Sequence, residues 1–164
     1  MEQAERLASA SNLNKKYVIG SMVAGLIPLP VVDLVALTGI QLKMLHSLAK
    51  LYDTPFSKDL GKSITGSLVG GLIPVGVTRA SAGSLAKFIP IGGTATGMIT
   101  TSVFAGATTY ALGKVFIQHF ESGGTFLTFD PNKVKEHFQA QFEKGQEKVT
   151  TTVQGEPQAA AAAA

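Results

Sequence analysis

One eleven-residue phrase occurs twice in the chain. Residues 21–31 read SMVAGLIPLPV, residues 67–77 read SLVGGLIPVGV, and a shorter echo, FIPIGG, begins at Phe88. Aligned without gaps, the two copies share Ser, Val, Gly, Leu, Ile, Pro and Val. Because a shared Gly-Leu-Ile-Pro core inside matching flanks seldom arises twice by chance, we interpret the phrase as a duplicated structural unit.

Each copy predicts an apolar helix that stops at a proline. Pro28 and Pro74 lack an amide donor and push the preceding residue away from helical geometry, and Pro30 extends the break in the first copy. Two apolar helices joined by a break without polar residues form a hairpin with a hydrophobic tip. Tips of soluble hairpins are normally polar. This tip therefore has to be buried, in a protein core or in a bilayer.

The composition favours a membrane-associated helical protein of one domain. Charged residues are only 15 % of the 164 residues, against roughly 25 % in ordinary globular chains, and Gly reaches 18. The net charge of +3 comes from scattered lysines, which gives no support to nucleic-acid binding. The absence of Cys excludes disulfides and thiolate metal sites, and it fits a reducing compartment. The polar N-terminal stretch is not expected to be a secretory signal.

The order of apolar and polar segments predicts an all-α fold. We expect a polar N-terminal helix in residues 1–16 and an apolar helical domain in residues 17–124. That domain contains two Pro-broken apolar helical hairpins, at about 17–52 and 63–87, and a long Gly/Thr-rich helix over 91–121. A C-terminal amphipathic helix is expected in residues 125–149, followed by a flexible tail over 150–164. The stripe Val134, Phe138 and Phe142 on that helix predicts docking onto a core, with partner binding as the alternative.

The charge-free stretches differ in how far they could enter a bilayer. The hairpin arms, at about 11 residues and about 17 Å, reach roughly half of the hydrocarbon thickness, so they would dip in and return. Residues 88–113 are long enough to span, but their glycines and hydroxyls dilute the apolarity, which leaves the question of a span open. Two pairs at small-xxx-small spacing, Gly66 with Gly70 and Gly93 with Gly97, allow helices to approach closely in lipid or in a soluble bundle.

Two ionisable residues occupy equivalent positions just after the two breaks. Superposing the copies places Asp33 opposite Arg79. If the copies pack about a local twofold axis, these residues would form a buried or interfacial ion pair, since an unpaired charge beside apolar tips is costly. The alternative is that each residue caps its own helix end. Gln41 and Thr38, within one turn on an apolar helix, are interpreted as interhelical hydrogen-bonding residues rather than catalysts.

No constellation in the chain predicts enzymatic chemistry. The GKS sequence at residues 61–63 resembles the end of a phosphate-binding loop, but Phe56 stands where that motif needs glycine, and a polar loop replaces the preceding strand. No nucleophile with a paired base stands out. We expect a non-enzymatic protein without cofactor or metal. The histidines are too scattered in sequence to predict a metal site: His46, His119 and His137.

A further signal is the pattern PLPVVDLVALTGIQLKMLHSLAKLY, then Thr-Arg-Ala at 78–80, then AKFIPIGGTATGMITTSVFAGATTYALGKVFIQHFESGG. Over roughly residues 17–124 the chain resembles a bacterial GTPase-associated domain-of-unknown-function family, the YcjF-like C-terminal domain. Family members are commonly found C-terminal to Era-like small GTPase domains or as small stand-alone proteins. The resemblance implies a stand-alone member, with a GTPase acting only in trans. The most specific matches are Pro30 with Asp33, Gln41, Arg79, Lys87 with Pro90, and residues 108–113.

Together these patterns predict a non-enzymatic helical protein at the cytoplasmic face of a bacterial membrane, peripheral or inserted. It is expected to contact membrane lipid, to self-associate and to work with a GTPase in trans. The alternative is a cytoplasmic helical adaptor or oligomeric scaffold whose apolar hairpins are buried in its own core. Structural or interaction roles are expected for Pro28, Pro30, Asp33, Gln41, Pro74, Arg79, Lys87, Pro90, Gly93 and Gly97.

Overall fold

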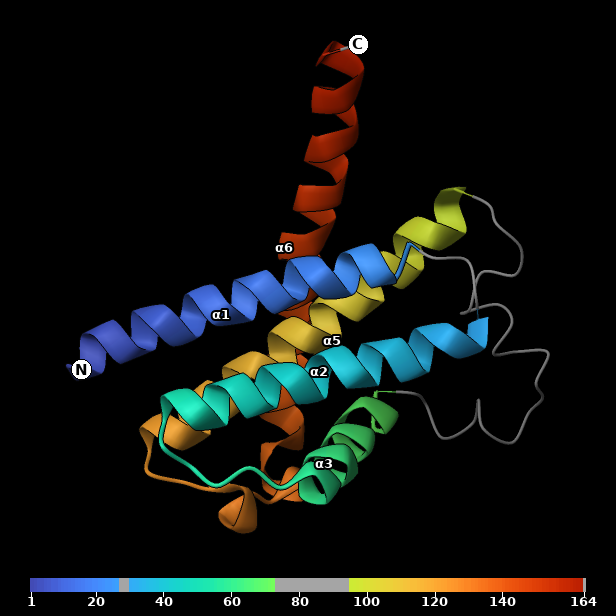
Figure 1. Cartoon of the computed structure of the whole chain (residues 1–164). Helices are drawn as coiled ribbons and strands as arrows, with labels where there is room; N and C mark the ends of the chain where they lie inside the picture. The colour runs from blue at the N-terminus through green and yellow to red at the C-terminus, as the bar shows by residue number, and fades with distance from the viewer. Residues whose placement is uncertain (27–29, 73–94, 164) are drawn as a thin grey trace.

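The fold is all-α in the part of the chain that the structure, a computed structural model, describes: residues 1–26, 30–72 and 95–163. The predicted fold class is thereby confirmed, and no strand occurs among these residues (Figure 1). The elements in chain order are α1 (Gln3–Ala24), α2 (Pro30–Leu51), α3 (Lys58–Gly70), α5 (Ala95–Glu121), the 3-10 turn η1 (Phe126–Thr128) and α6 (Pro131–Ala163).

Helices α1 and α2 pack side by side as an antiparallel pair (Figure 1). Residues 27–29, which join them, lie outside the described residues, so the Pro-broken hairpin stays a prediction. Helix α1 ends at Ala24, and α2 begins at Pro30, where the missing amide donor costs nothing in the first turn. Helix α1 runs without interruption through the domain boundary that the sequence suggested at residue 16.

The two copies of the repeated phrase end their first helices in the same way. The amide of Gly25 donates to the Ser21 carbonyl at 2.9 Å, and the equivalent amide of Gly71 donates to the Ser67 carbonyl at 3.1 Å. Both glycines keep right-handed backbone angles, with φ of −67° and −69°. The continuation of the second copy lies outside the described residues, so the duplication of the whole unit stays a prediction.

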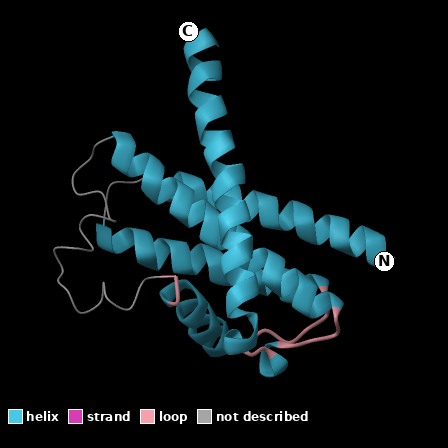
Figure 2. Ribbon diagram, turned by 180° about the vertical axis from the view of Figure 1, so that it is seen from behind, coloured by secondary structure: helices cyan, strands magenta, loops and turns pink. Residues whose placement is uncertain are grey.

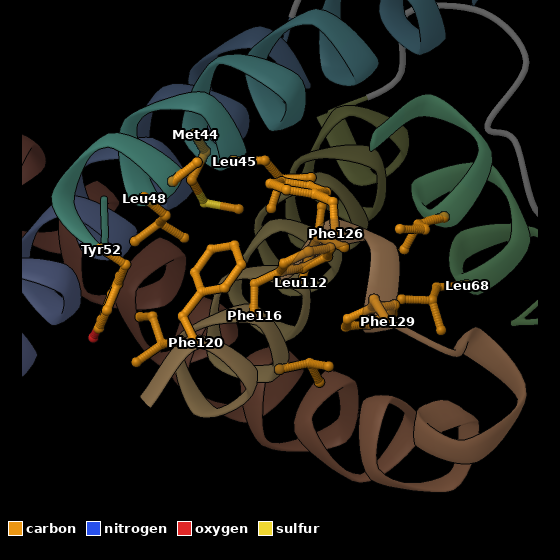
Figure 3. Packing of buried hydrophobic residues seen from close by; sticks show 14 of the residues in the cluster. Met44, Leu45, Leu48, Tyr52, Leu68, Leu112, Phe116, Phe120, Phe126 and Phe129 are labelled. Atoms are coloured by element: carbon orange, nitrogen blue, oxygen red, sulfur yellow. The ribbon is translucent and has the colours of Figure 1, made fainter. Parts of the chain in front are cut away.

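Helix α5 is the centre of the bundle and contacts α1, α2 and α6. The largest cluster of buried side chains surrounds its second half, where Phe116 stacks on Phe129 with ring centroids 4.4 Å apart. Figure 3 shows side chains of α2, α3, α5 and the segment around η1 converging there, with Met44 and Leu48 from α2 facing Phe116 and Phe120. The aromatic core therefore lies toward the ends of the helices that are remote from the proline break.

Helix α6 packs across α5 with the predicted apolar stripe (Figure 2). It opens after Asp130, whose carboxylate accepts from the Asn132 amide at 3.0 Å. Phe138 is 1 % exposed, and Phe142 packs edge-on against Phe104. The apolar stripe of α6 thus docks onto the core of the protein, which was the first of the two interpretations from the sequence. The helix continues to Ala163 and projects from the body, rather than giving way to a flexible tail at residue 150 (Figure 1).

Candidate functional site

Four helix termini gather at one end of the molecule. The C-terminal ends of α1 and α3 and the N-terminal ends of α2 and α5 point the same way in both views (Figures 1 and 2). This follows from the alternating directions of successive helices that pack against one another. We call this the apolar end.

The described parts of these helices carry one charge near the apolar end, Asp33 in the first turn of α2. From the apolar end inward, the first lysines are Lys16 on α1, Lys43 on α2 and Lys62 on α3. At about 1.5 Å per residue these lysines lie roughly 12 to 20 Å from the ends of their helices. That depth is about half of a bilayer's hydrocarbon thickness.

Large apolar side chains are exposed at this end. Ile19 and Val23 are each 59 % exposed, Leu26 is 46 % exposed, and Val35 on α2 is 72 % exposed. Ile19 and Val23 are four residues apart, so they lie on one face of α1, and Leu26 follows just after the end of the helix, so we call these three residues the stripe. A grouped apolar surface of this kind marks a contact with another molecule or with a membrane.

Beneath this surface, hydroxyl groups join α1 to α5. The Ser21 and Thr109 hydroxyls are 2.8 Å apart, and the Ser102 hydroxyl donates to the Met22 carbonyl at 2.8 Å. These groups belong to a buried set that we call the polar seam: Asn14, Ser21, Gln41, Ser102, Thr108 and Thr109. Buried polar groups of this type stabilise a fold only when they are hydrogen-bonded, and most of the seam is.

Gln41 connects α2 to the same seam. It is 1 % exposed, and its amide nitrogen donates to the hydroxyls of Thr108 and Thr109 at 3.3 Å each. The sequence analysis expected this residue to hydrogen-bond between helices rather than to catalyse a reaction, and its partners are on α5.

Two glycines of α5 allow the close approach of α1. A Cβ atom added to Gly113 would overlap the side-chain amide of Asn14, and one added to Gly106 would lie 2.7 Å from Cγ of Met22. By contrast, Gly66 and Gly70, the pair that sequence spacing predicted for close packing, are exposed and have nothing within 4 Å of an added Cβ.

This packing surface was not among the sites predicted from the sequence. Its signal is the series Ser102, Gly106, Thr109 and Gly113, in which small or hydroxyl residues recur at spacings of four, three and four. Such spacing places them on one face of a helix, where small residues let a second helix approach.

Of the other predicted site residues, three fall in described helices. Pro30 opens α2, Asp33 lies in its first turn, and Gly97 lies in the first turn of α5. The proposed pair of Asp33 with Arg79 is untested, because its second member lies outside the described residues. Also outside them are Pro28, Pro74, Lys87, Pro90 and Gly93.

The opposite end of the bundle carries a hydrogen-bonded carboxylate. The Tyr52 hydroxyl donates to Glu121 at 2.6 Å, and the Gln3 amide donates to the other oxygen at 3.0 Å. The hydrogen bond from Tyr52, followed by that from Gln3, lowers the pKa of Glu121. Burial, and then the carboxylate, raises the pKa of Tyr52. This arrangement fastens α2 and the start of α1 to the end of α5.

Within the described ranges, no group of three His, Asp or Glu residues is placed to hold a metal ion. The same ranges contain no helix with the length and apolarity needed to cross a membrane. The stretch for which a span was left open, residues 88–113, begins outside them.

Comparison with known proteins places the chain in a family. Residues 2–147 match the family described as Domain of unknown function (DUF697). The chain belongs to this family. The predicted resemblance to a domain-of-unknown-function family is confirmed at that level, whereas its association with GTPases stays a prediction. The chain is also 42 % identical over 136 residues to magnetosome membrane protein 22 of Magnetospirillum gryphiswaldense. The aligned region covers 83 % of this chain and 70 % of the relative. No solved structure matches.

Proposed function

We propose that this chain is a non-enzymatic protein of the cytoplasmic face of a bacterial membrane, which contacts the bilayer through its apolar end. The observation that carries the proposal is the exposed stripe Ile19, Val23 and Leu26, with Val35 exposed on α2, at an end where the described helices are almost free of charge. The relative from Magnetospirillum gryphiswaldense, which is named a membrane protein, supports it. Self-association and a GTPase acting in trans belong to the same proposal.

The exposed areas indicate a reversible contact. Burying a large aliphatic side chain completely yields about 1.5 to 3 kcal/mol. With exposures between 46 % and 72 %, the four side chains would supply about 0.7 to 2.2 kcal/mol each, or about 5 kcal/mol together. A single myristoyl chain gives a similar, marginal affinity. The stripe alone therefore gives only marginal membrane affinity. Electrostatic attraction to anionic head groups would increase it, since Lys43 and Lys62 lie at the depth of those head groups.

A fluorescence experiment tests which end meets the bilayer. The chain has no Trp, so Val23→Trp introduces a single reporter at the apolar end. Leu127→Trp is the matched control, because Leu127 is 86 % exposed and lies in η1, away from that end. With vesicles of phosphatidylcholine and phosphatidylglycerol, we expect a blue shift and quenching by brominated acyl chains for Val23→Trp alone. Equal responses at the two positions would contradict the proposal.

Flotation with vesicles gives an independent test. Ile19→Glu/Val23→Glu should reduce flotation at least tenfold, whereas Leu127→Glu should float like the original chain. The aromatic core lies apart from the apolar end, so these exposed substitutions should leave the fold intact, which circular dichroism would check. If the original chain does not float and runs as a defined oligomer, the alternative of a soluble scaffold or adaptor replaces the membrane proposal.

A further inference from the structure

A groove between α2 and α3 combines an apolar wall with two lysines. It has a volume of about 480 Å³ and is lined by Val35, Thr38, Gly39, Leu42, Lys58 and Lys62. The α2 residues belong to the charge-free stretch between Asp33 and Lys43, and both lysines are exposed in the first half of α3. The described helices α2 and α3 pack against each other, with α3 beneath α2 in Figure 1.

Two glycines shape this groove. Gly61 is buried where α3 meets α2, and a Cβ added there would lie 3.0 Å from Cδ2 of Leu42. Because Gly61 has no side chain, the turn that carries Lys58 and Lys62 can lie close to α2. Gly39 has no heavy atom within 4 Å of an added Cβ, so the wall beside it is open.

The charged residues that line the groove lie at one end of it, and Thr38 is the polar residue of the α2 wall. Along α2 its wall runs from Leu42 to Val35, about 10 Å, toward the apolar end. The lysines come from the part of α3 that is remote from that end. If the apolar end enters a bilayer, this direction matches that of a phospholipid, whose head group lies at the surface and whose acyl chain points inward.

We propose that the groove binds one anionic phospholipid, with its phosphate between Lys58 and Lys62 and an acyl chain against Val35, Gly39 and Leu42. The proposal rests on the proposed membrane function and names a lipid partner for it. Charge complementarity selects an anionic head group, and the apolar wall selects a chain of methylene groups over free phosphate. Asp59, next to Lys58, does not line the groove.

Calorimetry with a soluble lipid tests the groove without a bilayer. Dihexanoylphosphatidylglycerol below its micelle concentration should bind with one site, dihexanoylphosphatidylcholine more weakly, and inorganic phosphate not measurably. Each lysine near an anionic group contributes about a fivefold change in affinity. Lys58→Gln/Lys62→Gln should therefore lower the affinity for the anionic lipid roughly 30-fold. Lys133→Gln/Lys144→Gln removes the same charge from exposed positions of α6 and should change it less than twofold.

Filling the groove is the second test. Gly39→Leu should abolish binding of the short-chain lipid while leaving the helical content unchanged. Gly20→Leu is the matched control, because Gly20 is also an exposed helical glycine with nothing within 4 Å of an added Cβ. Unchanged binding in Gly39→Leu, or equal loss in both variants, would overturn the proposal.

The two proposals fail in different ways. Ile19→Glu/Val23→Glu should lose flotation but still bind the short-chain anionic lipid. The Lys58 and Lys62 substitutions should lose binding of that lipid, and their flotation with anionic vesicles should fall to the weaker level seen with neutral vesicles. If the original chain floats but shows no saturable binding of the short-chain anionic lipid, the groove proposal is wrong and the membrane proposal stands. Binding of the neutral and anionic lipids with equal affinity would likewise overturn the role of the lysines.

Discussion

Gly113→Ala is expected to destabilise the protein although alanine is the better helix former. Gly113 lies within α5, and its missing side chain leaves the space that the amide of Asn14 occupies. All three of the nearest atoms to an added Cβ belong to that amide. Either α1 moves away from α5, or Asn14, which is 2 % exposed, leaves its position and loses the hydrogen bond to the Tyr110 carbonyl.

The size of the effect follows from three contributions. Replacing a helical glycine with alanine stabilises by about 1 kcal/mol. Overpacking a buried site costs about 1 to 3 kcal/mol, and the lost hydrogen bond costs about 1 kcal/mol more. The net destabilisation of Gly113→Ala is therefore about 1 to 3 kcal/mol. Gly20→Ala, at an exposed position with nothing within 4 Å of the new Cβ, should instead stabilise by about 1 kcal/mol.

Urea denaturation followed by circular dichroism measures both effects, and a double-mutant cycle identifies the cause. Asn14→Ala removes the group that the new methyl overlaps, so the double variant Asn14→Ala/Gly113→Ala should recover most of the lost stability. We expect a coupling free energy of about 1 to 3 kcal/mol between the two positions. If Gly113→Ala behaves like Gly20→Ala, or if the two substitutions are additive, the close packing of α1 on α5 is not as described.

Three further results are expected. Gly145→Ala should destabilise by about 1 to 3 kcal/mol in urea melts, because its Cβ would lie 3.1 Å from the backbone of α5, which cannot rotate away. Tyr52→Phe should raise the pKa of Glu121. Because the pKa of Glu121 is lowered in the folded state, Glu121 stabilises the fold above its unfolded-state pKa, and this stabilisation is lost as the pH falls. The free energy of unfolding measured below about pH 5 should therefore vary less with pH in Tyr52→Phe than in the original chain. Ser21→Cys/Thr109→Cys should form a disulfide under mild oxidation, visible as a mobility shift, because the hydroxyls it replaces are 2.8 Å apart in a chain without other cysteines.

Local backbone chemistry was the most predictable part of the fold. A proline cannot donate to a helix wherever the chain goes, so a break between α1 and α2 could be predicted from the repeated phrase. Pro30 opens α2 instead of extending the break, because the first turn of a helix tolerates a missing amide donor. The start of α6 has a similar local cause, since Asp130 caps the helix and Pro131 occupies its first position, later than the expected start at residue 125. These signals depend on neighbours in sequence alone.

Contacts between distant helices were less predictable. The spacing of Gly66 and Gly70 satisfies the same small-residue rule as the spacing of Ser102 and Gly106 or of Thr109 and Gly113, and sequence gives no way to choose the pair that meets another helix. The choice depends on which face α5 turns toward α1, which is decided by packing. Gln41 was identified because an amide on an apolar helix face needs a partner, but that partner, Thr108 and Thr109, could only come from the tertiary structure.

The polar seam bears on how the apolar end would meet a membrane. A core held by the hydrophobic effect alone gains nothing in lipid, because acyl chains are as apolar as its side chains. Close packing at Gly106 and the hydrogen bond of Ser21 with Thr109 do not depend on surrounding water. The half of the bundle that would enter the bilayer is therefore joined by interactions that persist there, while the aromatic core around Phe116 remains on the aqueous side. On this argument the apolar end would be inserted as a folded unit, with α1 and α5 still in contact.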